Sequence, residues 1–215
     1  MENDVDTEYL YNLKMTNFPF VLLEDVGSIQ TNIVTTDSLR AVKKAVKYLI
    51  ENGHKKIVHF SGPPNSYYTK KRIAGFKHAF SESPLVFNKN MVVKIGASYH
   101  DGYYKTLEYF KILSKKDYPT AIVCFNDHQA LAVMSALKEL QIQVPQDISV
   151  IGYDDIFSAN SYPVPLTTIR SSGHKIGVTA AKILIENIES KSLGQYEHIE
   201  LKTELIVGKS SRKLN

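Results

Sequence analysis

Residues 119–155 read PTAIVCFNDHQALAVMSALKELQIQVPQDISVIGYDD and contain two short apolar segments, AIVCF and ISVIGY. Between them lie a segment with helical spacing and a Val-Pro turn, so the predicted order is strand, helix, strand. Both predicted strands are continuously apolar, which is typical of a parallel sheet whose two faces are covered by helices. We therefore interpret this stretch as one βαβ unit.

Each of these two strands ends in a polar pair, Asn126-Asp127 after the first and Asp154-Asp155 after the second. In open parallel sheets, ligands bind just beyond the carboxyl ends of the strands. The pairs therefore predict hydrogen-bonding side chains along one rim of the sheet. Asn126 or Asp127 could instead cap the helix that starts there. Asp154 and Asp155 could be turn residues or ligands of a hard metal ion.

The alternation of strands and helices continues on both sides of this stretch. The other predicted strands are FPFVLLED, NIVTT, KKIVHFSG, MVVKIG and ELIVG, with helical patterns between most of them. This order predicts an α/β fold with a doubly wound parallel sheet. The stretch from NIVTT to ISVIGY supplies about five helix-and-strand units, enough for one complete lobe. FPFVLLED belongs to a second sheet that is short of strands in this sequence.

Composition bounds the class of protein. The formal net charge of +4 is mild, and the basic residues are spread along the chain, so charge alone gives weak evidence for nucleic-acid binding. The single cysteine, Cys124, excludes an intrachain disulfide and fits a reducing compartment. The acidic first residues lack the apolar core of an export signal, and no apolar run could span a membrane. We expect a soluble, cytoplasmic protein.

Signatures of catalysis are absent from the sequence. It contains no GxxxxGK[ST], GxGxxG after a strand, GxSxG or HExxH motif. The histidines are scattered without metal-ligand spacing, and Cys124 lies in mid-strand, where a buried structural thiol is expected. An acidic pair at the end of a strand also suggests a phosphoryl-accepting receiver domain. Such a domain needs the pair after an early strand and the acceptor aspartate after a central one, and this sequence does not have that arrangement. We therefore expect no enzyme, no cofactor and no metal site.

Arg72 begins a predicted helix after a long polar loop and is a candidate ligand contact. A guanidinium presents a rigid fork of donors, which suits vicinal hydroxyls or a carboxylate, although Arg72 could also be a surface charge. With Asn126 and Asp154 on one rim, Arg72 predicts a sugar-type site. Tyr68 or Tyr99 would cover an apolar face of the ring.

A family resemblance rests on six segments that occur in matching order and spacing: GHKKIVHFSGP, RIAGFKHAF, PTAIVCFNDHQALAVMSAL, VPQDISVIGYDD, PVPLTTIR and IGVTAAKILI. They resemble the effector-binding, periplasmic-binding-protein-like (type I) domain of the LacI/GalR family of bacterial transcriptional regulators, from about residue 18 onward. The resemblance implies lobes joined by crossover strands, with a small effector, often a sugar or a nucleobase, in the cleft. One lobe is complete here and the second is partial.

The resemblance also implies roles for individual residues. Five positions match ligand contacts of the family: Glu24, Tyr68, Arg72, Asn126 and Asp154. Two further positions, Leu131 and Tyr162, match places where the family's effector domains meet across a two-fold axis, which implies a homodimer. One departure is Gln141, which stands where the family has a glycine after the helix of the βαβ unit.

The matching segments divide the chain into two lobes. Residues 1–36 and 164–172 form the partial amino-terminal lobe with crossover strands, and residues 37–163 and 173–215 form the carboxyl-terminal lobe. The family's helix-turn-helix head is missing from the sequence, so operator DNA would be bound by a part of the parent protein outside this chain. Our first hypothesis is the ligand-sensing and dimerising domain of a transcriptional repressor or activator. The alternative is a solute-binding protein of a sugar transport system, which shares the fold, and an enzyme ranks last.

Overall fold

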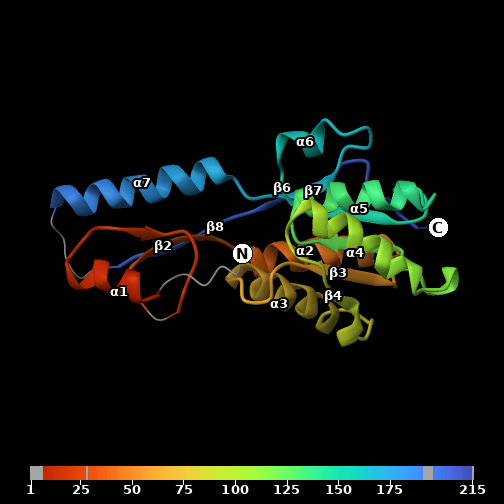
Figure 1. Cartoon of the computed structure of the whole chain (residues 1–215), viewed down its shortest axis with the longest axis horizontal. Helices are drawn as coiled ribbons and strands as arrows, with labels where there is room; N and C mark the ends of the chain where they lie inside the picture. Colours follow the sequence, from red (N-terminus) through yellow and green to blue (C-terminus); the bar gives the residue numbers. More distant parts are fainter. Residues whose placement is uncertain (1–6, 28, 191–195, 215) are drawn as a thin grey trace. The chain divides into compact units, whose positions relative to one another are not determined.

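Two units make up the fold of the chain, shown as a computed structural model that describes residues 7–27, 29–190 and 196–214 (Figure 1). The first unit consists of Met1–Asp37 and Ser172–Thr203, and the second of Ser38–Ser171 and Glu204–Asn215. Within the described ranges, no helix is long and apolar enough to cross a membrane.

The first unit is built on a three-stranded parallel sheet with strand order β1-β2-β8. Its elements are α1 (Thr7–Met15), β1 (Val21–Leu22), β2 (Asn32–Thr36), α7 (Gly173–Ser190) and β8 (His198–Leu201). All five residues of β2 are buried, as expected for the central strand. The predicted strand FPFVLLED is reduced to two residues. The sequence HIEL of β8 was not predicted as a strand, because its alternation of polar and apolar residues lacks an apolar run.

The second unit contains a six-stranded sheet with strand order β4-β3-β5-β6-β7-β9. Its strands are β3 (Ile57–Ser61), β4 (Val92–Lys94), β5 (Ala121–Cys124), β6 (Ser149–Asp154), β7 (Thr167–Arg170) and β9 (Glu204–Ile206). The first five pair in parallel, whereas β9 is antiparallel to β7. The prediction of a parallel α/β sheet is therefore confirmed, with one antiparallel strand added at an edge.

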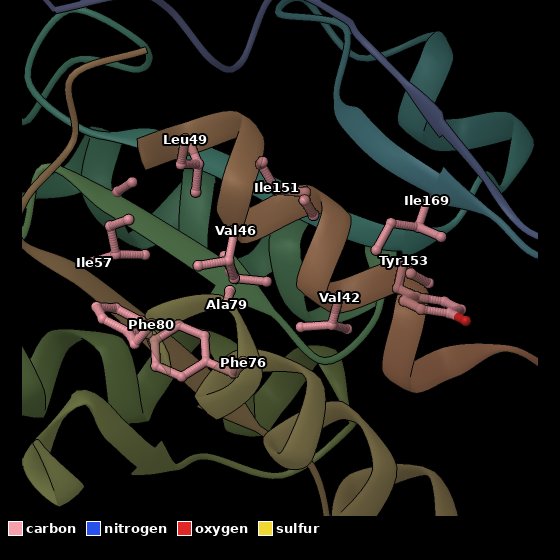
Figure 2. Packing of buried hydrophobic residues seen from close by; sticks show 14 residues of the cluster. Val42, Val46, Leu49, Ile57, Phe76, Ala79, Phe80, Ile151, Tyr153 and Ile169 are labelled. Atoms are coloured by element: carbon pink, nitrogen blue, oxygen red, sulfur yellow. The ribbon is translucent and has the colours of Figure 1, made fainter. Parts of the chain in front are cut away.

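Helices cover both faces of this sheet (Figure 1). They are α2 (Ser38–Glu51), α3 (Tyr67–Ser81), α4 (Tyr99–Lys111), α5 (Asp127–Glu139) and the short α6 (Phe157–Asn160). Successive strand residues point to opposite faces, so Ile57 packs with the side chains of α2 and α3, whereas Val58 packs with those of α4 and α5. Figure 2 shows the first of these cores, where Phe76 and Phe80 of α3 meet Val46 of α2.

The observed division of the chain differs from the predicted lobes at two segments. The predicted boundaries placed 164–172 in the partial lobe, but β7 pairs with β6 in the second unit. They also placed 173–215 entirely in the complete lobe, but α7 packs on β1 and β2, and β8 pairs with β2 in the first unit. Membership of a unit depends on strand pairing between distant segments, which a division by sequence order does not capture.

Gln141 adopts the left-handed conformation, with φ of 58°, directly after α5. The Ile142 N–H donates to the Leu137 carbonyl at 2.8 Å, which closes the helix end. Helices commonly end with a glycine in this conformation, because glycine has no Cβ to clash there. The backbone of this chain therefore keeps the turn that a glycine would form, with a side chain that is less suited to it.

Candidate functional site

Four neighbouring parallel strands of the second unit, β3, β5, β6 and β7, end at a common rim. At this rim the chain leaves β3 for the loop that enters α3, and leaves β5 at Phe125-Asn126. It leaves β6 at Asp154 and β7 at Arg170-Ser171. The polar ends that the sequence predicts on separate strands therefore share one edge of the sheet.

Arg72 lies among aromatic side chains from three of these segments. It is only 5 % exposed, and its Cζ is 3.6 Å from the ring centroid of Tyr153, 4.4 Å from that of Phe125 and 5.6 Å from that of Tyr68. Its Nη1 donates a hydrogen bond to the Phe125 carbonyl. Its Nε is buried and has no hydrogen-bond partner within the described ranges. Arg72 is thus a core arginine with unused donor capacity, and not a surface charge.

The charges of Arg72 and Asp154 act on each other across this site. Burial lowers the pKa of Arg72, while Tyr153, Asp154 and Tyr68 oppose that shift. Burial raises the pKa of Asp154, and Arg72 opposes that shift. No ion pair joins the two side chains directly in the part of the chain that the structure describes. Both charged groups therefore retain hydrogen-bonding capacity at the rim.

Asp154 sits in an unusual backbone conformation, with φ of 112°, and the following Asp155 has φ of 59°. The Ser171 hydroxyl donates to Asp154 Oδ1 at 3.1 Å, and Arg170 Nε donates to Asp155 Oδ2 at 2.6 Å. Residues other than glycine with φ in this range carry strain, and such strain is concentrated at functional sites. The turn after β6 is thus held by partners from β7 and its end, and it presents Asp154 at the rim.

Asn126 caps α5, as the alternative interpretation of the sequence predicts. Its Oδ1 accepts from the Gln129 N–H at 2.8 Å, and its Nδ2 donates to the Ala97 carbonyl at 3.0 Å. Both polar atoms of the side chain already have protein partners. A contact between Asn126 and a ligand would have to use the hydrogen-bonding capacity that remains.

Asp127, the first residue of α5, is buried and links the segments that form the rim. Its Oδ2 accepts from the Ile156 N–H at 2.9 Å, and its Oδ1 accepts from the Thr168 hydroxyl at 2.6 Å. Burial raises the pKa of Asp127 to about 7, against the opposing effect of these hydrogen bonds. Asp127 thereby joins α5 to the turn after β6 and to β7, which is a structural role.

Five other residues, three of them predicted and two not, can now be placed. Tyr68, at the start of α3, is the outermost of the aromatic rings around Arg72. Tyr99 does not belong to the rim, because its hydroxyl donates to Ser135 Oγ on α5 at 3.0 Å. Glu24 lies in the first unit, two residues after β1, and is partly exposed. Tyr153 and Phe125 were missed as site residues, since an aromatic residue in an apolar strand signals only core.

Leu131 and Tyr162, the predicted dimer contacts, are largely satisfied within a single chain. Leu131 is 8 % exposed, so it lies in the core of the second unit and is not an exposed apolar residue. Tyr162 is half-buried against the core on the α4 and α5 side, and its hydroxyl is 3.1 Å from Ser135 Oγ. Their role as dimer contacts stays a prediction.

Groups suited to metal binding or catalysis do not gather at this rim. Among the described residues, no three His, Cys, Asp or Glu side chains are placed to hold a metal ion. Cys124 is buried in β5, and burial raises the pKa of its thiol. What the rim offers is a buried guanidinium, a carboxylate and aromatic faces, which is chemistry for holding a polar ligand.

The family model for periplasmic binding protein-like domains matches residues 46–211, which include the whole of this rim. The chain belongs to this family. Its resemblance to the effector-binding domain of LacI/GalR regulators is also confirmed by similarity to individual proteins. The family relation accounts for the α/β fold with mostly parallel sheets.

The relatives of this family member are transcriptional regulators. The chain is 36 % identical to the HTH-type transcriptional repressor PurR of Haemophilus influenzae over 93 % of its own length and 59 % of that protein's length. It is similar to a LacI-family regulatory protein from Chloroflexus aggregans (TM-score 0.85, 27 % identity, covering 97 % of this chain and 73 % of that one). It is also similar to a LacI-family regulator from Enterococcus faecium with bound ribose (TM-score 0.84, 25 % identity, covering 98 % and 76 %).

The chain spans about three-fifths of the length of the curated repressors that it matches. The matched portion is the effector-binding part, so the chain is a ligand-sensing regulatory domain. These relatives are repressors and not enzymes.

Proposed function

We propose that this chain is the sensor of a LacI/GalR-type transcriptional regulator and that its effector is a sugar or a related polyhydroxy compound. The observation that carries the proposal is that Arg72 and Asp154 lie at the same rim and influence each other's pKa. They form no direct ion pair in the described part of the chain, and the buried Arg72 Nε has no hydrogen-bond partner there. In this proposal, operator DNA is bound by another part of the parent protein, in the cytoplasm.

The chemistry of the rim fits vicinal hydroxyls. The guanidinium of Arg72 donates to hydroxyl oxygens, and the Asp154 carboxylate accepts from hydroxyl protons, so one sugar edge satisfies both. The ring of Tyr68 offers an apolar face for the C–H side of a sugar. The bound ribose in the E. faecium regulator supports this class of ligand.

Two further residues belong to the proposal on weaker grounds. Asn126 would contact the ligand only through hydrogen bonds that its side chain can still form beyond those to Gln129 and Ala97. Glu24 is included because of the family resemblance. The named relative is a repressor, which favours the regulator over the sugar-transport alternative.

Homodimerisation is the second part of the proposed function. Leu131 is in α5, and Tyr162 follows α6, in which the side chain of Phe157 is 87 % exposed. An isolated chain gains by covering a large apolar residue of this kind. We propose that this surface forms the two-fold contact, with Leu131 and Tyr162 supporting it from within.

Isothermal titration calorimetry tests the ligand assignment. A panel of pentoses, hexoses and nucleobases is titrated into the chain, and the ligand that binds is then titrated into Arg72→Lys and Asp154→Asn variants. Because a lost buried polar contact costs about 1–3 kcal/mol, affinity should fall by roughly 5- to 150-fold in each variant.

Arg212→Lys is the matched control, since Arg212 donates to the carbonyls of Pro145 and Gln146, at the end of β6 away from Asp154. It should bind like the unaltered chain. Binding of nucleobases without any sugar would overturn the sugar assignment. Equal affinity in Arg72→Lys and Arg212→Lys would overturn the site.

A further inference from the structure

A pocket lies beside β4, the edge strand of the six-stranded sheet. It encloses about 370 Å³ and is lined by residues from the end of β3, from α3, from the segment before β4 and from β4 itself. None of its lining residues is Tyr68, Arg72, Asn126 or Asp154. The pocket therefore adjoins the rim at Ser61 and Pro64 but shares none of the candidate ligand contacts described above. Its volume suits a small molecule.

Basic side chains surround this pocket. Four of its lining residues are lysines, Lys70, Lys77, Lys89 and Lys94, and no lining residue is acidic. Two lysines outside the pocket, Lys43 and Lys47, contact Glu82 at 2.5 and 3.4 Å. Across the described ranges, none of the four pocket lysines has a carboxylate within 4.0 Å.

This arrangement concentrates positive charge without neutralising it. The four lysines come from α3, from the segment before β4 and from β4, so the fold and not one helix face brings them together. Clustered charges of one sign over an apolar wall raise the local concentration of the opposite ion. An unpaired cluster around a concave surface therefore favours an anion and disfavours a cation.

The floor of the pocket is apolar. Ile73 of α3, Phe87 and Val92 of β4 line it. Lys77 Nζ lies 5.6 Å from the centroid of the Phe87 ring, so a basic group stands directly beside an aromatic wall. Inorganic phosphate alone would leave the apolar side chains of this floor in contact with water. The fit is better for an anion that also carries an apolar or planar body.

Thr69 supplies an independent sign of a missing partner. This residue of α3 lines the pocket and is 1 % exposed, and its Oγ1 has no hydrogen-bond partner in the part of the chain that the structure describes. A buried hydroxyl without a partner is destabilising, and native proteins rarely retain one. An oxygen atom of a bound molecule would accept its hydrogen bond.

We propose that this lysine-lined pocket binds a small organic anion, in which a carboxylate or phosphate group meets the lysines and an apolar or planar body covers Ile73 and Phe87. The pocket is a second ligand site of the chain, distinct from the effector site. Because the two sites share no residue, this inference does not depend on the proposed function.

Calorimetry with defined probes tests it. The probes are 1-naphthyl phosphate and 1-naphthoate, with neutral 1-naphthol and inorganic phosphate as controls for the body and the charged group. We expect both anionic probes to bind, and both controls to bind more weakly. The stronger of the two anionic probes identifies the preferred charged group.

Variants then locate the binding. In a Lys77→Gln, Lys89→Gln double variant the affinity of the anionic probes should fall about tenfold, since each exposed charge contributes modestly. A Lys115→Gln, Lys116→Gln double variant, altered outside the pocket, should bind as the unaltered chain does. Thr69→Val, which keeps the side-chain shape, should weaken binding without lowering thermal stability.

Three results would overturn the proposal. The first is that the anionic probes bind no better than 1-naphthol. The second is that the two double variants have equal affinity. The third is that Arg72→Lys, and not the pocket variants, abolishes binding, which would locate the probe at the rim.

Discussion

The guanidinium carbon of Arg72 lies 3.6 Å from the centre of the Tyr153 ring, so a buried cation is stacked on an aromatic face at the rim of the sheet. The Tyr153 hydroxyl is in turn 3.1 Å from Ser38 Oγ at the start of α2. One side chain thus supports the charge of the site and ties it to the core helix that precedes β3. In the proposed site, an arginine held in this way would be oriented before a ligand arrives, which would lower the entropic cost of binding.

The two parts of the Tyr153 side chain should contribute separately to stability. Tyr153→Phe removes the hydroxyl contact with Ser38 and should lower the free energy of unfolding by about 1 kcal/mol. Tyr153→Leu also removes the face beneath Arg72 and should cost about 1–2 kcal/mol more. Urea denaturation followed by circular dichroism measures both values. If the two variants lose equal stability, the stacked cation contributes nothing.

Replacing Gln141 by glycine should stabilise the chain. Because Gln141 holds φ of 58°, a Cβ is strained there, and relief of that strain should raise the free energy of unfolding by about 0.5–1 kcal/mol. Gln146→Gly is the matched control, because Gln146 is not among the residues with positive φ and should lose stability on the same change. Thermal denaturation of the two variants should shift in opposite directions. A shift in the same direction would contradict the strain.

The raised pKa of Asp127 predicts a pH dependence with a definite sign. The folded chain holds a proton on this carboxyl up to pH about 7, whereas the unfolded chain releases it near the ordinary value of 3.8. The stability that Asp127 contributes is therefore complete below pH 3.8 and is lost as the pH rises towards 7. The difference in unfolding free energy between the unaltered chain and Asp127→Asn should fall across this window, by at most about 1.4 kcal/mol per pH unit.

His59 imposes the opposite trend on the unaltered chain. Burial lowers its pKa from 6.5 to about 4, so stability from His59 is present above pH 6.5 and is lost as the pH falls towards 4. Both proteins in the Asp127 comparison carry His59, so its effect cancels in their difference. Denaturation at a series of pH values gives the curve. A flat difference would show that Asp127 is ionised in the folded chain.

Phe157 provides a direct test of the proposed dimer. Phe157→Lys places a charge on each of two equivalent surfaces, so it should raise the dimer dissociation constant at least about tenfold. Val86→Lys is the control, since Val86 is similarly exposed, at 84 %, but lies in the segment after α3. Sedimentation equilibrium measures both. A monomeric unaltered chain, or equal effects of the two variants, would remove the proposed interface.

Much of the second unit could be predicted because its signals are local. AIVCF and ISVIGY form β5 and β6, and the polar residues that follow each strand lie at one rim, as the general geometry of parallel sheets requires. The residue type of Arg72 and its place after a long loop favour it as a ligand contact, which stays a prediction. The resemblance to LacI/GalR effector domains rested on the same continuous motifs, and the comparisons confirm it.

The roles of individual residues depended on contacts between distant segments. From the sequence, Asn126 is equally suited to a helix cap and to a ligand contact. Only the structure shows that its Oδ1 caps α5 through the Gln129 N–H and that its Nδ2 donates to the Ala97 carbonyl. Leu131 matches a dimer contact of the family, yet within this single chain its side chain is only 8 % exposed. Periodicity describes one helix, whereas burial depends on what packs around that helix.

The sequence by itself determined the strand-helix alternation, the polar strand ends and the parallel sheet, since each follows from residues close together in the chain. Only the tertiary structure decided that β8 and α7 join the first unit, that three aromatic rings surround Arg72, and that four lysines from separate elements line one pocket. The physical reason is that backbone preferences and apolar patterns act over a few residues. Strand pairing, burial and the environment of a charge arise instead from segments that meet only when the chain folds.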